Sequence, residues 1–237
     1  MGPLLVGLIP VALGVVLSPL AIMALIAILL SRLARVNGVA YLLGWTIGLA
    51  GLLALFGWIF QTLEVHRYGS PALWVSLLRL LLGIVLIVAA IWVYRRGANR
   101  IRRMAAAASG RDVAKAAALP GWLQSVSTFR PVRSFFLGVG LFVVNPVDAS
   151  CAIIAALDIT QAEVTTAQGI AVGIGFTVIG VLPIAVPVIW LLIARQRAQP
   201  ALDAMRTWIA GHTHVLNAAL LLVIGVLQLQ KGVSALF

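Results

Sequence analysis

The stretch LFVVNPVDAS, residues 141–150, places Asn145, Pro146 and Asp148 inside an apolar run that extends from Ser134 to Leu157. A run of this length can cross a bilayer as a helix. Proline removes a helical N–H donor and displaces the carbonyl four residues earlier, and a charge at the centre of a membrane helix costs about 2.5–3.5 kcal/mol. The sequence therefore predicts a membrane helix that is interrupted near its middle.

The composition of the chain is that of an integral membrane protein. Hydrophobic residues make up 62% of the 237 residues and charged residues only 10%, which is more apolar surface than a soluble domain of this length can bury. Because the apolar runs are long and continuous, they indicate helices rather than strands of a barrel. We therefore expect an all-α, polytopic membrane protein.

The chain contains six apolar runs that are each long enough to span a membrane. They cover residues 4–30, 38–60, 73–94, 134–157, 168–194 and 213–236. The N-terminal run has no basic segment before it and outlasts the apolar part of a signal peptide, so we interpret it as a retained span.

Basic residues set the predicted orientation. The segment 95–133 carries nine arginines and lysines against one acid, Asp112, which favours the cytoplasmic side. The loops 31–37 and 195–212 then also lie inside, and both termini lie outside the plasma membrane. The net charge of +11 is distributed between apolar runs, so it indicates topology rather than binding to nucleic acid.

The two halves, residues 1–94 and 134–237, show weak self-similarity on either side of the basic loop 95–133. The segment VVLSPLAIMALIAIL (15–29) matches FVVNPVDASCAIIAAL (142–157), which aligns Ser18-Pro19 with Asn145-Pro146. Further pairs follow in the same order: Gly44 and Gly48 with Gly169 and Gly173, then LLGIVL (81–86) with LVIGVL (222–227). Because each half has three spans, related halves must be inverted, and inverted repeats are typical of transporters.

The paired prolines allow two interpretations. Pro19 and Pro146 each free a backbone carbonyl at membrane depth, and Ser18 or Asn145 could repair the resulting kink locally. Alternatively, the helices are discontinuous and their freed groups line a substrate cavity. Their corresponding positions in the two halves raise the weight of the second interpretation.

Asp148 is the strongest functional candidate, because a carboxylate at this depth must be protonated, paired or facing water. We expect it to exchange protons or to contact a polar headgroup. Arg79 lies at a comparable depth in the third span, so it could pair with Asp148 or extend towards the interface.

Small residues and prolines elsewhere have structural interpretations as well. Gly44, Gly48, Gly169 and Gly173 form small-xxx-small pairs that favour close helix packing. Pro183 and Pro187 share one face of the fifth span and predict either a hinge or a static kink. The loop 95–133 is either a surface-lying amphipathic helix or a linker that sets topology.

Several function classes find little support in the sequence. The single cysteine, Cys151, excludes an internal disulfide or a two-thiol relay. His212 and His214 are far from Asp148 in the predicted topology, so no metal site or Ser-His-Asp arrangement is expected. We expect neither an enzyme nor a cofactor.

The chain resembles the lysine exporter superfamily, which carries an Asn-Pro motif early in the second three-helix repeat. It more narrowly resembles the GAP family of peptidoglycolipid and sulfolipid-1 addressing proteins. The resembling pieces are LSPLAIMALIAILLS (17–31), NGVAYLLGWTIGLA (37–50), FLGVGLFVVNPVDA (136–149) and RQRAQPALDAMRTWIAGHTHVLNAALLLVIGVLQLQKGVSAL (195–236). The resemblance implies a six-helix inverted-repeat protein that exports or delivers envelope glycolipids in mycobacteria and their relatives.

One position departs from the family pattern. Relatives usually have Asn-Pro-Lys, whereas Asn145-Pro146 is followed here by Val147 and then Asp148. If the lysine of relatives binds an anionic substrate or couples protons, an acid in its place would favour a cationic or sugar-like headgroup, or proton exchange.

These observations predict a transporter or transport accessory for a cell-envelope glycolipid or a small amphiphile. The substrate would enter between the first and fourth spans, near Pro19, Pro146 and Asp148. One alternative is a proton-coupled exporter of amino acids or cations, which would need a closed polar cavity rather than a lateral apolar opening. Another alternative is a non-transporting scaffold that assembles envelope-lipid synthases through the basic loop.

Overall fold

The computed structural model describes residues 1–29, 31, 33–63, 73–105, 129–162, 164–194 and 218–234, without the side chains of 19, 97–105 and 194. All regular secondary structure in these ranges is helical, which confirms the all-α prediction. The helices are α1 (Gly2–Val16), α2 (Pro19–Leu29), α3 (Ala34–Thr62), α4 (Leu73–Ala105), α7 (Pro131–Val144), α8 (Pro146–Gln161), α9 (Thr166–Ala194) and an unlabelled C-terminal helix, Ala218–Ser234.

Three helices are long and apolar enough to cross a membrane by themselves: α3, α4 over Leu73–Arg96, and α9. Two further spans arise if α1 with α2 and α7 with α8 are each counted as one bent span. The C-terminal helix is apolar but shorter than these. The structure thus contains three to five candidate membrane spans, and the sixth span stays a prediction.

Both bent spans break immediately before a proline. The axes of α1 and α2 differ by 44°, and those of α7 and α8 by 69°. Pro19 begins α2 and Pro146 begins α8, positions where the missing N–H costs no hydrogen bond because the first turn has no intrahelical acceptor. Asn145 caps α8: its side-chain oxygen accepts the Val147 N–H at 3.1 Å. The second break is therefore a true discontinuity whose end is repaired locally.

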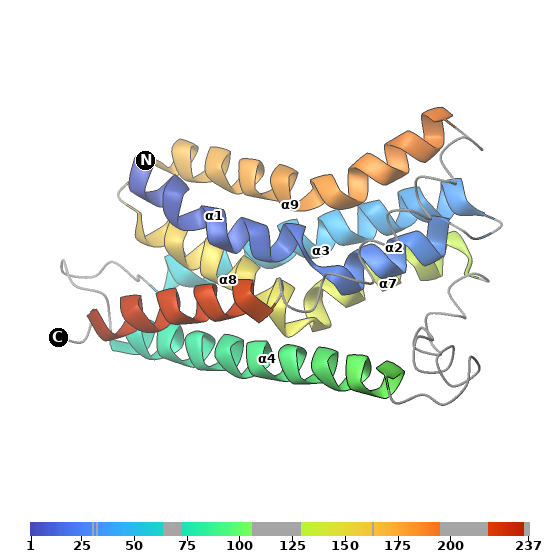
Figure 1. Ribbon diagram of the computed structural model, residues 1–237. Helices are drawn as coiled ribbons and strands as arrows, with labels where there is room; N and C mark the ends of the chain where they lie inside the picture. The colour runs from blue at the N-terminus through green and yellow to red at the C-terminus, as the bar shows by residue number, and fades with distance from the viewer. Residues whose placement is uncertain are drawn as a thin grey trace.

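The helices run side by side as a bundle, with α4 and the C-terminal helix together along one edge (Figure 1). Both chain termini lie at one end, which we call the termini end. The ends of α4 and α7 that flank residues 106–128 lie at the opposite end, which we call the loop end. Those residues, and with them most of the predicted basic loop and its amphipathic helix, lie outside the described ranges.

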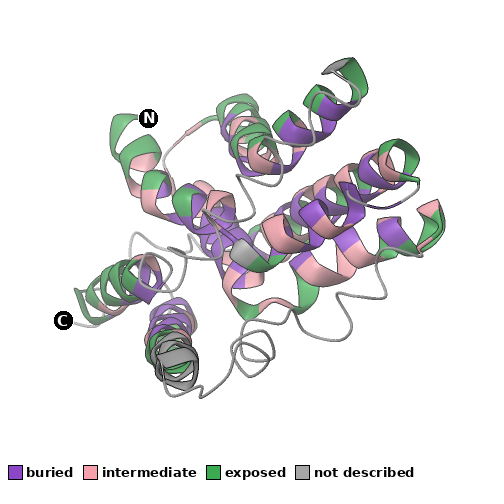
Figure 2. Cartoon of the chain, turned by 45° about the vertical axis from the view of Figure 1, so that its right-hand side comes forward, coloured by how far each residue is buried: buried purple, intermediate pink, exposed green. Residues whose placement is uncertain are grey.

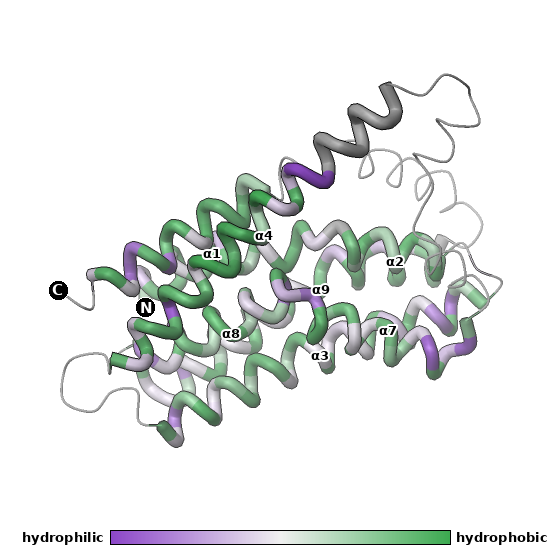
Figure 3. The backbone as a smooth tube through the Cα atoms, turned by 90° about the horizontal axis from the view of Figure 1, so that it is seen from below, coloured by the Kyte–Doolittle hydropathy of each residue, from purple (hydrophilic) through white to green (hydrophobic). Residues whose placement is uncertain are grey.

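Buried residues face the middle of the bundle and exposed ones its outside (Figure 2). The largest fully buried side chains include Trp45, Tyr41 and Phe142. The outside is itself strongly apolar, with side chains such as Val144 and Ile193 more than three-quarters exposed. Figure 3 shows hydrophobic residues along the middles of the helices and hydrophilic ones gathered towards their ends. A surface of this kind is suited to contact with lipid.

Glycines bring α3 and α7 into close contact. A Cβ atom added to Gly44 would lie 2.0 Å from the backbone oxygen of Phe135, and one added to Gly48 would lie 3.0 Å from Phe142. The corresponding atoms on Gly169 and Gly173 would have ordinary contacts at 3.5 and 3.6 Å. The predicted glycine packing is thus tight in the first half and loose in the second.

A second glycine contact joins α4 to the C-terminal helix. A Cβ atom on Gly83 would lie 2.9 Å from the Gly225 oxygen, and one on Gly225 would lie 3.0 Å from the Gly83 oxygen. These glycines come from the two matched segments 81–86 and 222–227. The two helices therefore pack backbone to backbone at this point.

The prolines of α9 do not end the helix. Pro183 and Pro187 lie inside the continuous helix Thr166–Ala194, which is visibly bent (Figure 1). The bend agrees with a prolyl kink, and a hinge movement at these residues stays a prediction.

Candidate functional site

The two helix breaks meet at Asp148. Ser18, between α1 and α2, donates its hydroxyl to Asp148 Oδ2 at 2.8 Å. Asn145, between α7 and α8, donates its side-chain amide to the same oxygen at 2.6 Å. We call these three residues the Asp148 cluster. It joins residues that are 130 positions apart in the chain, so the matched Ser-Pro and Asn-Pro motifs form one polar site.

The Asp148 cluster is sealed inside the bundle. Asp148 is 0% exposed and Ser18 2%, and the other carboxylate oxygen, Oδ1, has no hydrogen-bond partner among the described residues. No described cation forms a salt bridge with Asp148. Because an uncompensated charge is costly at such a site, a proton or a polar group bound at Oδ1 would stabilise the Asp148 carboxyl.

Aromatic residues of α3 connect this region to three other helices. The Tyr41 hydroxyl donates to the Ala21 carbonyl of α2 at 2.9 Å, and the Trp45 indole N–H to the Gly180 carbonyl of α9 at 3.3 Å. The Trp45 ring packs edge-on against Phe142 of α7, with 4.9 Å between centroids. The sequence interpretation missed these residues, although a Tyr and a Trp inside an apolar span are a signal, because such rings usually lie at the interfaces.

Cys151 is a packing residue in this structure. It is fully buried on α8, and a Cβ atom on Gly14 of α1 would lie 2.8 Å from its sulfur. The described residues contain no group of three or more His, Cys, Asp or Glu side chains that could hold a metal ion.

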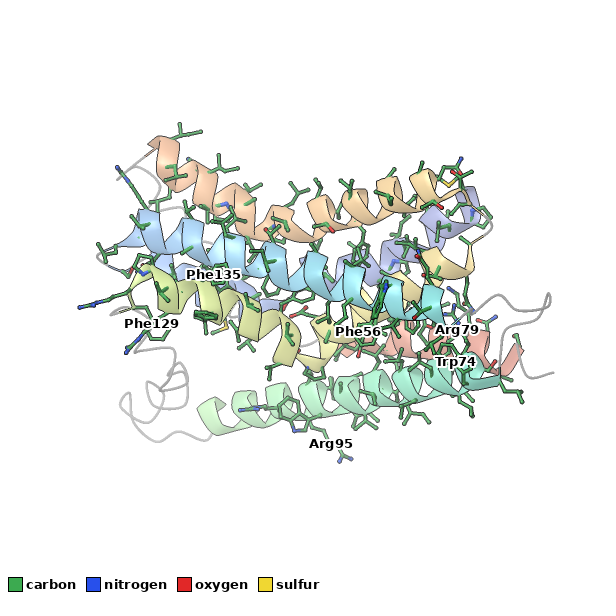
Figure 4. The ribbon with its side chains drawn as sticks, turned by 180° about the vertical axis from the view of Figure 1, so that it is seen from behind. Phe56, Trp74, Arg79, Arg95, Phe129 and Phe135 are labelled. Carbon is green, nitrogen blue, oxygen red and sulfur yellow. The ribbon has the colours of Figure 1, made fainter. Side chains whose placement is uncertain are left out.

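Arg79 contacts a different acid from the one considered in the sequence. Its guanidinium pairs with Asp158 at 2.7 Å, donates to Gln228 at 2.8 Å and also donates to Gln161. The possible pair with Asp148 is therefore wrong. Arg79 is only 6% exposed, and its extension towards the interface stays a prediction. Figure 4 shows it at the same end of the bundle as Trp74 and Phe56, whereas Arg95 lies further along α4.

Arg79 pairs with Asp158 because α8 is longer than predicted from the sequence. The sequence placed Asp158 in the loop 158–167, but α8 continues to Gln161 and buries Asp158 to 8% exposure. Lys231 of the C-terminal helix reaches the second oxygen of Asp158 at 3.0 Å. We call this group the Asp158 cluster; it comprises Arg79, Asp158, Gln161, Gln228 and Lys231. It ties α4, α8 and the C-terminal helix together.

A cavity of about 420 Å³ lies beside the Asp158 cluster. It is lined by Met1, Pro3, Leu4, Gly7, Asp158, Gln161, Ala162, Val164 and Lys231. None of Ser18, Asn145 and Asp148 lines it. The structure thus separates a sealed polar site near mid-bundle from an accessible cavity at the termini end.

A comparison with protein families decides the classification. A model of the family described as Sap, sulfolipid-1-addressing protein, matches residues 8–234. The chain belongs to this family. The matched range contains both helix breaks and both polar clusters. No curated protein and no solved structure matches the chain. The resemblance to sulfolipid-1-addressing proteins is confirmed, whereas the wider GAP family and the link to the lysine exporter superfamily stay predictions.

Proposed function

We propose that the protein is a membrane transporter or transport accessory that exports or delivers a cell-envelope lipid or small amphiphile. The name of the family contains a sulfolipid, which suggests a sulfated lipid as the substrate class. The observation that carries the proposal is the meeting of two helix breaks at one buried acid, Asp148. Discontinuous membrane helices that meet at a polar site are the structural basis of many transporters.

An inverted repeat with six spans is part of this proposal, and the packing supports it. Ser18 and Asn145, which align in the sequence, both donate to Asp148. The matched segments that contain Gly83 and Gly225 pack against each other. The helix after each broken span also packs on the other half: α3 contacts α7 and α8, and α9 contacts α1 and α2. Reciprocal contacts of this kind are expected when two halves are related by a two-fold axis in the membrane plane.

The proposed orientation puts the termini end outside the plasma membrane and the loop end in the cytoplasm. It is supported by the position of both termini at one end and of the helix ends next to the basic loop at the other (Figure 1). The division into residues 1–94, 95–133 and 134–237 belongs to the same proposal.

The Asp148 cluster suggests how transport is controlled. In the closed arrangement, Ser18 and Asn145 both bind Oδ2 and hold the two breaks together. Separation of the breaks would release this oxygen and expose Oδ1 to the opened space. We assign Asp148 to proton exchange or to contact with hydroxyl groups of the headgroup, since both need a carboxyl group with an unused bonding position.

The test uses purified protein in liposomes that contain a sulfated glycolipid labelled with a dithionite-sensitive fluorophore. Dithionite bleaches only the outer leaflet, so protein-dependent movement appears as additional bleaching. We expect Asp148→Asn to slow this movement about tenfold, the effect of about 1.4 kcal/mol on a barrier. A wild-type rate in this variant would contradict the proposed role of Asp148.

An accessory that needs other proteins would show no movement in liposomes. In that case, we expect cells with and without the protein to differ in the surface fraction of their envelope lipid. Equal surface fractions, together with inactive liposomes, would refute the delivery function.

Two other functions remain as alternatives from the sequence. A proton-coupled exporter of amino acids or cations would move those solutes in the same liposomes, with no lipid movement. A scaffold for envelope-lipid synthases would bind such an enzyme through residues 95–133 and move neither. We propose no catalytic activity, because the predicted topology places no histidine at the depth of Ser18 and Asp148, and a Ser-His-Asp triad needs one.

A further inference from the structure

The cavity at the termini end has the size and lining of a ligand site. Its volume of about 420 Å³ falls within the range of about 300–1,000 Å³ that is usual for small-molecule pockets. Apolar residues of α1, including Pro3 and Leu4, form one side, and polar residues of the Asp158 cluster form the other. Such a lining suits an amphiphile, with a polar group on one side and an alkyl chain on the other.

Positive charge exceeds negative charge among the described residues of this cluster. Asp158 carries one negative charge and is already paired with Arg79, which is almost fully buried and has further polar partners in Gln228 and Gln161. Arg79 alone neutralises Asp158, so Lys231 adds a positive charge that the pair does not need. The resulting surplus favours an anion.

Lys231 is also the accessible member of the cluster. Its side chain is 43% exposed, against 7% for the side chain of Asp158. Its ammonium lies against α1 at Gly7, where an added Cβ atom would be 3.8 Å from Nζ. An ammonium group has three donors, and the structure gives this one a single partner among the described residues, Asp158. Lys231 can thus bind an anion while Asp158 keeps its pair with Arg79.

We propose that this cavity binds an anionic amphiphile, with a sulfate- or phosphate-type headgroup on Lys231 and the alkyl part along α1. Pro3 and Leu4 of α1 line the cavity, so their apolar side chains would contact the alkyl part. The proposal rests on the proposed function for the identity of the amphiphile as the transported lipid. Binding itself does not depend on transport.

The experiment measures binding of a sulfated glycolipid and its unsulfated counterpart to the full-length protein in nanodiscs of neutral lipid. We expect the sulfated form to bind at least tenfold more tightly, and Lys231→Gln to remove this preference. Lys231→Arg retains the charge and should keep it. Arg95→Gln removes an exposed charge further along α4, away from the cavity, so it controls for general electrostatic attraction.

A second pair of variants tests the cavity independently of charge. Gly7→Leu places a large side chain beside Lys231 and should abolish binding, whereas Gly2→Leu adds the same side chain to α1 at a position with nothing within 4 Å of the new Cβ. Inorganic sulfate that competes with the glycolipid would show that the anion is recognised by itself. Equal binding of the sulfated and unsulfated forms, or unchanged binding in both Lys231→Gln and Gly7→Leu, would overturn the proposal.

The outcomes separate this proposal from the transport function. Lys231-dependent binding without any lipid movement, in liposomes or in cells, would refute the proposed function and leave the binding site in place. Lipid movement without Lys231-dependent binding would refute only the site.

Discussion

Removal of one hydroxyl group tests the Asp148 cluster most directly. Ser18→Ala deletes the donor to Asp148 Oδ2 and leaves Asn145 as the remaining described donor to that oxygen. A buried hydrogen bond of this kind contributes about 1–3 kcal/mol to stability, the upper part of the range when the acceptor is charged. Because this bond also holds the two helix breaks together, we expect the variant to be less stable than the wild type and to move the labelled lipid faster.

The matched control is Ser134→Ala. Ser134 is also completely buried, but its hydroxyl has no hydrogen-bond partner among the described residues. The two substitutions remove the same atom, so their difference isolates the bond to Asp148. We expect Ser134→Ala to change the free energy of unfolding by no more than about 0.5 kcal/mol.

The measurement is reversible unfolding of both variants in mixed micelles, repeated in the Asp148→Asn background. If Ser18 acts through Asp148, its removal should cost less once the carboxylate is gone, and the double-mutant cycle gives that coupling directly. Equal stability losses for Ser18→Ala and Ser134→Ala, or a coupling of zero, would refute the reasoning.

Two further predictions concern packing and charge. Gly44→Ala should destabilise the protein by about 1–3 kcal/mol, because the new methyl group would lie 2.0 Å from the Phe135 backbone oxygen. The control, Gly51→Ala, meets no atom within 4 Å and should be neutral or stabilising by up to about 1 kcal/mol. A smaller loss of stability for Gly44→Ala than for Gly51→Ala would contradict the packing of α3 on α7. Arg79→Gln breaks the buried ion pair with Asp158 and should lower the free energy of unfolding by about 3–5 kcal/mol. The control, Arg95→Gln, changes an exposed position and should leave the unfolding midpoint almost unchanged. Similar midpoints for both variants would show that the Arg79–Asp158 pair does not stabilise the fold.

The broken helices could be predicted from the sequence because their cause is local. A proline cannot donate its N–H, so Pro146 inside an apolar run predicts a kink or an interruption at that point, although Pro183 and Pro187 bend α9 without ending it. The alignment of Ser18 with Asn145 added a long-range expectation, a shared site, from two local motifs. The contacts of both side chains with Asp148 agree with it.

The partner of Arg79 could not be predicted in the same way. From the sequence, only the depth of each residue along its span could be inferred. Asp148 and Arg79 have similar depths if each helix is straight and ends where the hydropathy falls. The 69° bend and the continuation of α8 to Gln161 change that coordinate, because they bring Asp158 to the end of the bundle where Arg79 lies. The contact of Lys231 with Asp158 was not predicted either, because one lysine near the end of an apolar run resembles an interface anchor.

The single acid at the meeting point has a further consequence. In the alignment that pairs Ser18 with Asn145, the residue opposite Asp148 is Ala21, whose carbonyl accepts the Tyr41 hydroxyl. One half thus contributes a carboxyl group where the other contributes a methyl group. A transporter with identical inverted halves would have inward- and outward-facing states of equal energy. If the chain transports as proposed, its two states would differ in the environment of the Asp148 carboxyl group and would therefore be unequal in energy.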